Sequence, residues 1–179
     1  MKFKIGDTLL DNNVFLAPMA GVTDLPFRLL CREQGAGMSV TEMVSAKAIL
    51  YKNKNTKELL AVDRAEGPVS VQLFGSDPEI MAAIAARIED GPYVAIDVNM
   101  GCPVPKIVNN HEGSALMKDP AQAEKVLTAM VKAVKKPVTV KFRKGFNDQN
   151  INAVEFAKMA ESCGVAAVAV HGRTSEQYY

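Results

Sequence analysis

Short apolar runs alternate with segments of helical periodicity along the whole chain. After a lead-in over residues 3–13, Asp77-Pro78 and Asp119-Pro120 each place a capping carboxylate before a proline suited to the first helical position. The helical segments that follow carry apolar stripes that would face a core. Strands that alternate with helices are typical of βαβ units and a parallel sheet. The apolar runs predict strands at 14–19, 39–43, 69–74, 94–99, 138–143 and 166–171.

The last four of these strands share a pattern of polar positions near their carboxyl ends. Apolar residues, mainly valines, occupy one face of each strand, and polar residues occupy the opposite face. A buried polar group without a partner destabilises a fold by about 1–3 kcal/mol. Several such groups in one place are therefore expected to bind a ligand. The residues that we expect to converge are Gln72, Asn99, Lys141 and His171.

Convergent polar groups favour a barrel over an open sheet. In a (β/α)8 barrel of the TIM type, the inward faces of the strands meet at the carboxyl-terminal mouth. An open doubly wound sheet concentrates its ligand groups at one switch point, and no Gly-x-Gly-x-x-Gly follows the first strand. A complete barrel needs about 250 residues, whereas this chain has 179. We therefore predict one α/β domain over residues 1–179, with about six of the eight βα units and an incomplete carboxyl terminus.

The segment 94–107 ends a predicted strand abruptly. Gly101 permits a close approach of the backbone to a ligand, and the prolines on either side of Val104 disfavour helical geometry in the residues before them. Cys102 is therefore expected in an extended conformation, within a long loop predicted over 100–118. Long loops in compact domains tend to carry function. From the residues alone, Cys102 is equally well a small buried apolar side chain or a reactive thiol.

These residues resemble the signature of the tRNA-dihydrouridine synthases, flavoproteins that reduce uridine in tRNA. The resemblance implies a barrel that binds FMN, takes electrons from NADPH and converts uridine to 5,6-dihydrouridine. It also implies a carboxyl-terminal helical domain that helps to hold tRNA and is absent here. The matching runs, in the order of the family, are Ala17-Pro-Met-Ala-Gly-Val-Thr-Asp24, Val71-Gln-Leu-Phe-Gly75, Ile96-Asp-Val-Asn-x-Gly-Cys-Pro-x-x-x-Ile107 with Gly113-Ser114, Val140-Lys-Phe-Arg-Lys-Gly145 and Val170-His-Gly-Arg-Thr174.

The same resemblance implies a role for each candidate residue. Cys102 is the expected catalytic acid that protonates C5 of uracil after hydride transfer to C6, since a thiol is mostly protonated at neutral pH. Asn99 and Arg173 are the expected substrate-binding residues. Arg143 and His111 are weaker candidates, and His111 stands where the family has glycine. The expected FMN-binding residues are Pro18, Met19, Ala20, Gln72, Lys141 and His171.

Composition adds few constraints to this picture. The chain is 48% hydrophobic, and we expect a cytoplasmic protein because we find no signal peptide or membrane span. Three cysteines without a Cys-x-x-Cys pair argue against a disulfide framework or a metal site. The net charge of +1 shows no basic excess for tRNA, so phosphate-binding charge is expected on one face or outside this chain.

Two other functions fit the sequence. One is an FMN barrel dehydrogenase that acts on a free pyrimidine, although the Asn-x-Gly-Cys-Pro run at 99–103 favours the tRNA enzyme. The other is a non-catalytic fragment that neither holds FMN nor turns over. The early end of the chain is the argument for this second alternative.

Overall fold

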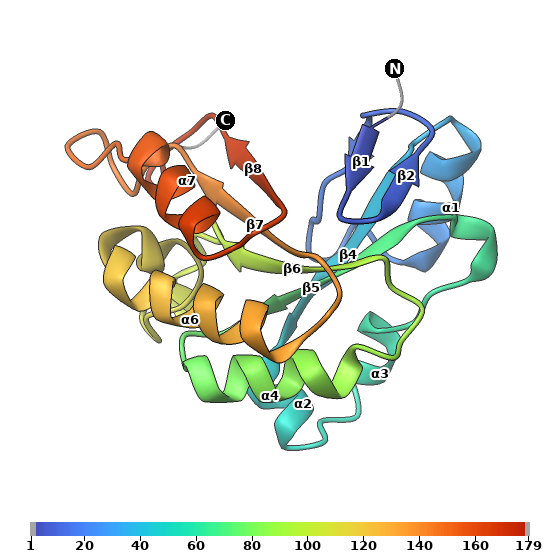
Figure 1. Ribbon diagram of the computed structural model, residues 1–179, viewed down its shortest axis with the longest axis horizontal. Coiled ribbons are helices and arrows are strands. Elements are labelled where there is room, and N and C mark those ends of the chain that lie inside the picture. The colour runs from blue at the N-terminus through green and yellow to red at the C-terminus, as the bar shows by residue number, and fades with distance from the viewer. Residues whose placement is uncertain (1–2, 178–179) are drawn as a thin grey trace.

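The computed structural model describes residues 3–177, and its centre is a curled parallel sheet (Figure 1). Within these residues the sheet has six strands, whose spatial order follows the chain. The curl makes a half-barrel, with β3 and β8 at its two open edges. The strands are β3 (Phe15–Leu16), β4 (Met38–Ser45), β5 (Val69–Phe74), β6 (Ala95–Met100), β7 (Val138–Arg143) and β8 (Ala167–His171).

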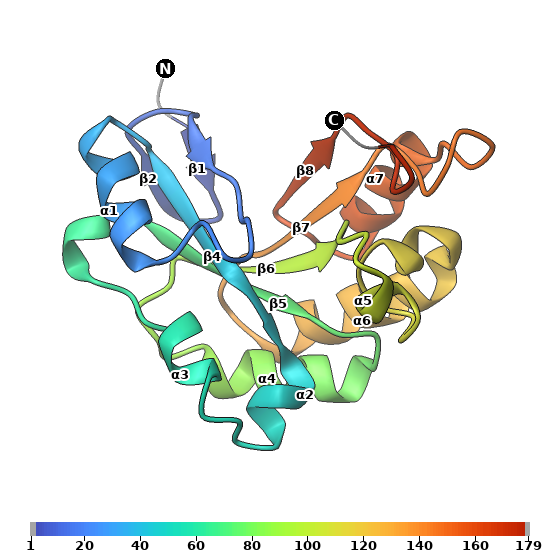
Figure 2. The same ribbon diagram turned by 180° about the vertical axis from the view of Figure 1, so that it is seen from behind.

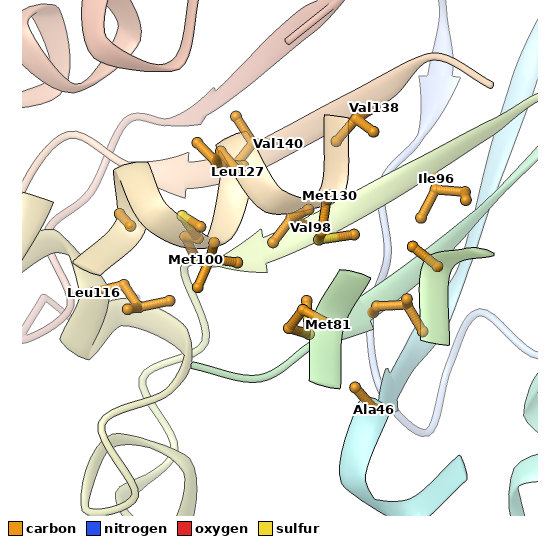
Figure 3. Close-up of a cluster of buried hydrophobic side chains, with 14 of the residues drawn as sticks. Ala46, Met81, Ile96, Val98, Met100, Leu116, Leu127, Met130, Val138 and Val140 are labelled. Atoms are coloured by element: carbon orange, nitrogen blue, oxygen red, sulfur yellow. The ribbon is translucent and has the colours of Figure 1, made fainter. Parts of the chain in front are cut away.

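Helices cover the convex side of the sheet, and the main core lies between the two layers (Figure 3). Val71 and Val98 of the sheet pack in the same cluster as Met81, Leu127 and Met130 of the helices. Aspartate caps and first-turn prolines start α4 and α6, as predicted. The helices are α1 (Leu25–Glu33), α2 (Ala46–Leu50), α3 (Thr56–Leu59), α4 (Pro78–Ile88), α5 (Pro105–Val108), α6 (Pro120–Ala133) and α7 (Ala153–Ser162), with 3-10 turns at Arg64–Glu66 and Gly113–Lys118.

A small hairpin closes the amino-terminal end of the half-barrel. Its strands, β1 (Phe3–Ile5) and β2 (Thr8–Leu10), pair antiparallel, and the sequence did not predict them. Ile5 and Leu10 of the hairpin are buried against the first residues of neighbouring strands, including Met38 of β4. Strands this short have too little alternation to be read from sequence, so tertiary packing decides this element.

Most predicted strands are confirmed, and the differences occur beside the cavity described below. The strand predicted at 14–19 is only Phe15–Leu16, because the backbone of Met19 bonds to Thr23 in a turn. The β4 strand is longer than predicted and changes register between Val40 and Met43. The loop predicted over 100–118 contains α5 and the 3-10 turn Gly113–Lys118. The α/β half-barrel is consistent with a truncated TIM barrel.

Candidate active site

The concave side of the sheet encloses a cavity of about 620 Å³. It extends from the hairpin and β3 on one side to β8 on the other. The hairpin and β8 stand opposite each other in Figures 1 and 2. Apolar side chains such as Ile5, Phe15 and Val40 form part of the lining. Most polar lining residues lie on β6 and β7 and at the end of β8, and Asn13 precedes β3. The cavity is therefore an apolar slot with a few polar groups, as in small-molecule sites.

A buried carboxylate lies at the centre of the polar lining. Asp97 is only 5% exposed and accepts hydrogen bonds from Thr139 Oγ1 (2.5 Å) and Gln72 Nε2 (2.6 Å). The register of the sheet explains this contact, because Gln72, Asp97 and Thr139 are direct neighbours across β5, β6 and β7. Both carboxylate oxygens accept from a neighbour, so the geometry suits an ionised Asp97.

The chain of hydrogen bonds continues from Gln72 to the cysteine loop. Asn99 Nδ2 donates to Gln72 Oε1 at 2.9 Å. The other end of the same amide, Asn99 Oδ1, accepts from the backbone N–H of Gly101 (3.1 Å) and of Cys102 (2.9 Å). The side chain of Asn99 therefore shapes the turn that carries Cys102.

Further contacts hold the cysteine loop from its other side. Ser114 N donates to the carbonyl of Cys102 at 3.0 Å, and Arg143 Nε donates to the carbonyl of Gly101 at 2.7 Å. Gly113 has a φ of 61°, and a Cβ there would lie 2.7 Å from the same Cys102 carbonyl. Only glycine allows this close approach. Cys102 itself is half-buried and unpaired with another cysteine.

Charges of both signs meet in the cavity. Burial lowers the pKa of Lys141, and the Asp97 carboxylate opposes this shift. Burial raises the pKa of Asp97, while the hydrogen bonds from Thr139 and Gln72 and the charge of Lys141 act in the opposite direction. The two groups therefore stabilise each other's charged forms at a site where burial disfavours both.

His171 stands in a positively charged environment at the end of β8. Its pKa is lowered, first by burial and then by the charges of Arg143, Lys141 and Arg173. Its Nδ1 accepts from the backbone N–H of Arg173 at 3.1 Å. In a neutral ring this bond leaves the proton on Nε2. His171 is thus arranged as a neutral hydrogen-bond donor beside the cavity.

The lip of the cavity is a turn that follows β3. Met19 exchanges two hydrogen bonds with Thr23, at 3.0 and 3.2 Å, and Gly21 N donates to Glu42 Oε1 at 2.5 Å. Glu42 lies where β4 changes register, and a bulge of this kind re-aims a side chain. Arg28 of α1 also holds this turn, because it donates to the Thr23 carbonyl at 2.9 Å.

The structure gathers the predicted residues in two groups. Gln72, Asn99, Lys141 and His171 converge as expected: the first two are bonded to each other, Lys141 is paired with Asn99 in register, and His171 shares the cavity with Lys141. Among residues 3–177, those of the predicted set that line the cavity are Pro18, Met19, Lys141 and His171. Those outside its lining are Ala20, Gln72, Asn99, Cys102 and Arg173.

Sequence reasoning left Asp97 out of the candidate residues and underrated Arg143. Asp97 shares the inward phase of Asn99 on β6, and this signal was available in the alternation of the strand. Arg143 was only a weak candidate, yet it joins two loops: besides Gly101, it donates to the Thr174 carbonyl at 2.7 Å. His111, the other weak candidate, is exposed with a φ of 59°, a conformation that favours glycine.

Comparison with known proteins identifies the family. The model of the family described as dihydrouridine synthase (Dus) matches residues 15–179. The chain belongs to the dihydrouridine synthase family. It is 48% identical over 177 residues to the tRNA-dihydrouridine synthase B proteins of Vibrio parahaemolyticus and Pseudomonas aeruginosa. The alignments cover 98% of this chain but 55% and 53% of those relatives, so the chain spans about half their length.

A solved structure supports the fold independently. The chain superimposes on the carboxyl transferase domain of Rhizobium etli pyruvate carboxylase (Y628A form, with pyruvate) with a TM-score of 0.53 and 14% identity. The superposition covers 87% of this chain and 26% of that one, and it shows a likeness of fold alone. Within residues 3–177, no helix is long and apolar enough to cross a membrane. The same residues contain no cluster of three or more His, Cys, Asp or Glu that could hold a metal.

Proposed function

We propose that this chain provides the catalytic half-barrel for reduction of uridine to 5,6-dihydrouridine in tRNA. The observation that carries the proposal is the cavity with Lys141 and His171 in its lining. The Cys102 loop is linked to Asp97 of the same lining by hydrogen bonds through Asn99 and Gln72. Membership of the dihydrouridine synthase family supports the same reaction. The site of action is the cytoplasm, where tRNA substrates are found.

The cavity fits a flavin in size and chemistry. Its volume of about 620 Å³ lies within the usual range for ligand sites, about 300–1,000 Å³. When bound, FMN supplies the hydride for C6 of uracil, and NADPH is the proposed source of its electrons. Lys141 provides a fixed cation that favours a reduced, anionic cofactor. Pro18, Met19 and Ala20 at the lip and His171 Nε2–H complete the proposed contacts.

Gln72 enters this proposal in a modified form. It has no exposed surface, and each end of its amide is bonded to another side chain. Each end still has one unused donor or acceptor, but Gln72 has no surface in the cavity lining that a flavin edge could contact. The main contribution of Gln72 in this geometry is to connect Asp97 with Asn99.

The remaining residues act on the substrate. Cys102 is the proposed acid that gives its thiol proton to C5 of uracil. Asn99 orients the base near that thiol, and Arg173 stabilises the negative charge that develops on the uracil carbonyl oxygens. A base in folded tRNA must be turned out of its stack to reach such a site.

The first experiment is the visible absorption spectrum of the purified 179-residue chain during titration with FMN. We expect the spectrum of a bound, oxidised flavin and a smaller bound fraction for Lys141→Ala, because the variant lacks the cation. His111→Ala is the matched control, since His111 lies outside the cavity lining. Added tRNA and NADPH should then yield dihydrouridine. A chain that binds no FMN at any concentration contradicts the proposed function for this half-barrel.

A further inference from the structure

We propose that Asp97 is a positioning residue that fixes the Cys102 loop through Gln72 and Asn99. The geometry that carries this inference is the unbroken chain of hydrogen bonds from the Asp97 carboxylate to the backbone N–H of Cys102. The catalytic meaning of the inference rests on the proposed function. The structural claim about the loop does not.

The orientation of each amide in this series of hydrogen bonds is determined at the Cys102 loop. Asn99 Oδ1 accepts two backbone N–H groups, so this end of the amide cannot turn away without leaving two donors facing an amino group. Asn99 therefore presents Nδ2 to Gln72, and Gln72 must accept this hydrogen bond through Oε1. The Gln72 amino group then points to the other side, where it needs an acceptor.

Asp97 is the acceptor that closes the chain. An ionised carboxylate can only accept, so Asp97 allows one orientation of the Gln72 amide. A side chain that can also donate would allow the reverse orientation, which sends the amino group of Gln72 toward that of Asn99. Gln72 has no exposed surface and Asp97 is 5% exposed, so water cannot easily replace the carboxylate.

A neighbouring residue shows what a polar group without this role does. Ser70 lies on the same strand as Gln72, two residues before it, and is also fully buried. Its hydroxyl donates to the carbonyl of Ala95 at 3.1 Å. This bond joins β5 to β6 but has no link to Asn99. Ser70→Ala therefore removes a buried hydrogen bond without changing the Asp97 chain, and it is the matched control.

The test measures the loop itself in the 179-residue chain. Amide hydrogen exchange of Gly101 and Cys102 reports on their bonds to Asn99, and the alkylation rate of Cys102 is compared with those of Cys31 and Cys163 in the same molecule. For Asp97→Ala we expect exchange at Gly101 and Cys102 to rise by about tenfold, the effect of losing one buried hydrogen bond. Exchange within α4 and α6 should stay unchanged. Ser70→Ala should leave the loop amides as they are.

A charge swap separates positioning from a merely structural role. Asp97→Asn alone can donate as well as accept, so it allows the reverse orientation of the Gln72 amide and should free the loop. Asp97→Asn combined with Gln72→Glu keeps the shape of both side chains and moves the charge to position 72, where the new carboxylate still accepts from Asn99. We expect the double variant to restore exchange and alkylation rates to within about twofold of the parent.

Three results would overturn the positioning role. They are unchanged loop exchange in Asp97→Ala, an equal rise in Ser70→Ala, and failure of the double variant to improve on Asp97→Asn. If Asp97→Ala does not fold, the last comparison still decides the matter. None of these measurements needs FMN or tRNA, so loss of the proposed function and loss of the positioning role give different results.

Discussion

The two faces of the parallel sheet use the same strands for different purposes. On the convex face, Val71 and Val98 are fully buried against helices. Their contacts are apolar, and such contacts do not depend on the orientation of a donor or an acceptor. On the concave face, Gln72 donates a hydrogen bond to Asp97, and such a bond depends on the direction of its donor. The convex face therefore supplies most of the free energy of folding, whereas the burial of polar groups on the concave face costs part of it and fixes their positions.

The substitution with the largest expected effect removes the thiol. In a preparation that reduces tRNA, Cys102→Ala should lower the rate of dihydrouridine formation by about 10²–10⁴-fold, the usual contribution of a general acid. The free energy of unfolding should change little, because Cys102 is only half-buried on a loop. Dihydrouridine is measured in the digested tRNA. Cys163→Ala is the control, and equal rates for the parent and Cys102→Ala would exclude Cys102 as the acid.

A substitution on the convex face should lower stability and leave the site unaffected. Leu127→Ala opens a cavity at a fully buried position of α6 and should lower the free energy of unfolding by about 2–5 kcal/mol. Urea denaturation measures this change. The folded fraction should still bind FMN with the affinity of the parent, because Leu127 is separated from the cavity by the sheet. A specific loss of FMN affinity in the folded fraction would show that the two faces are coupled.

The smallest expected effect is a pH dependence on the concave face. The folded state lowers the pKa of His171, so folding releases protons from this residue. The stability that depends on a neutral His171 is therefore present above its ordinary pKa of about 6.5 and is lost as pH falls below that value. Urea denaturation of the parent at pH 7.5 and at pH 5.5 should show this loss.

His171→Gln should make that pH dependence weaker, because glutamine does not titrate. His111→Gln is the control, since His111 lies on an exposed loop. All other titratable groups, including Asp97 and Lys141, are the same in both variants, so their contributions cancel in the comparison. An identical loss of stability in the parent and in His171→Gln would remove His171 as the source.

Local patterns account for much of the fold and for part of the site. Strand alternation is a property of a few consecutive residues, so it correctly placed Gln72, Asn99, Lys141 and His171 on one side of the sheet. The partners of these residues could not be read in the same way. A hydrogen-bond partner depends on which residue lies opposite on the next strand, and the chain does not encode that register locally.

The sequence by itself determined the order of strands and helices, the inward phase of the polar residues and the loop character of Cys102. Alternation, capping residues and prolines act within a few positions of the chain, so these features needed no distant contact. Tertiary structure alone decided the hairpin at the base of the half-barrel, the link from Asp97 to the cysteine loop and the bridge that Arg143 makes between Gly101 and Thr174. Each of these joins residues far apart in the chain, which only the curl and register of the sheet bring within bonding distance.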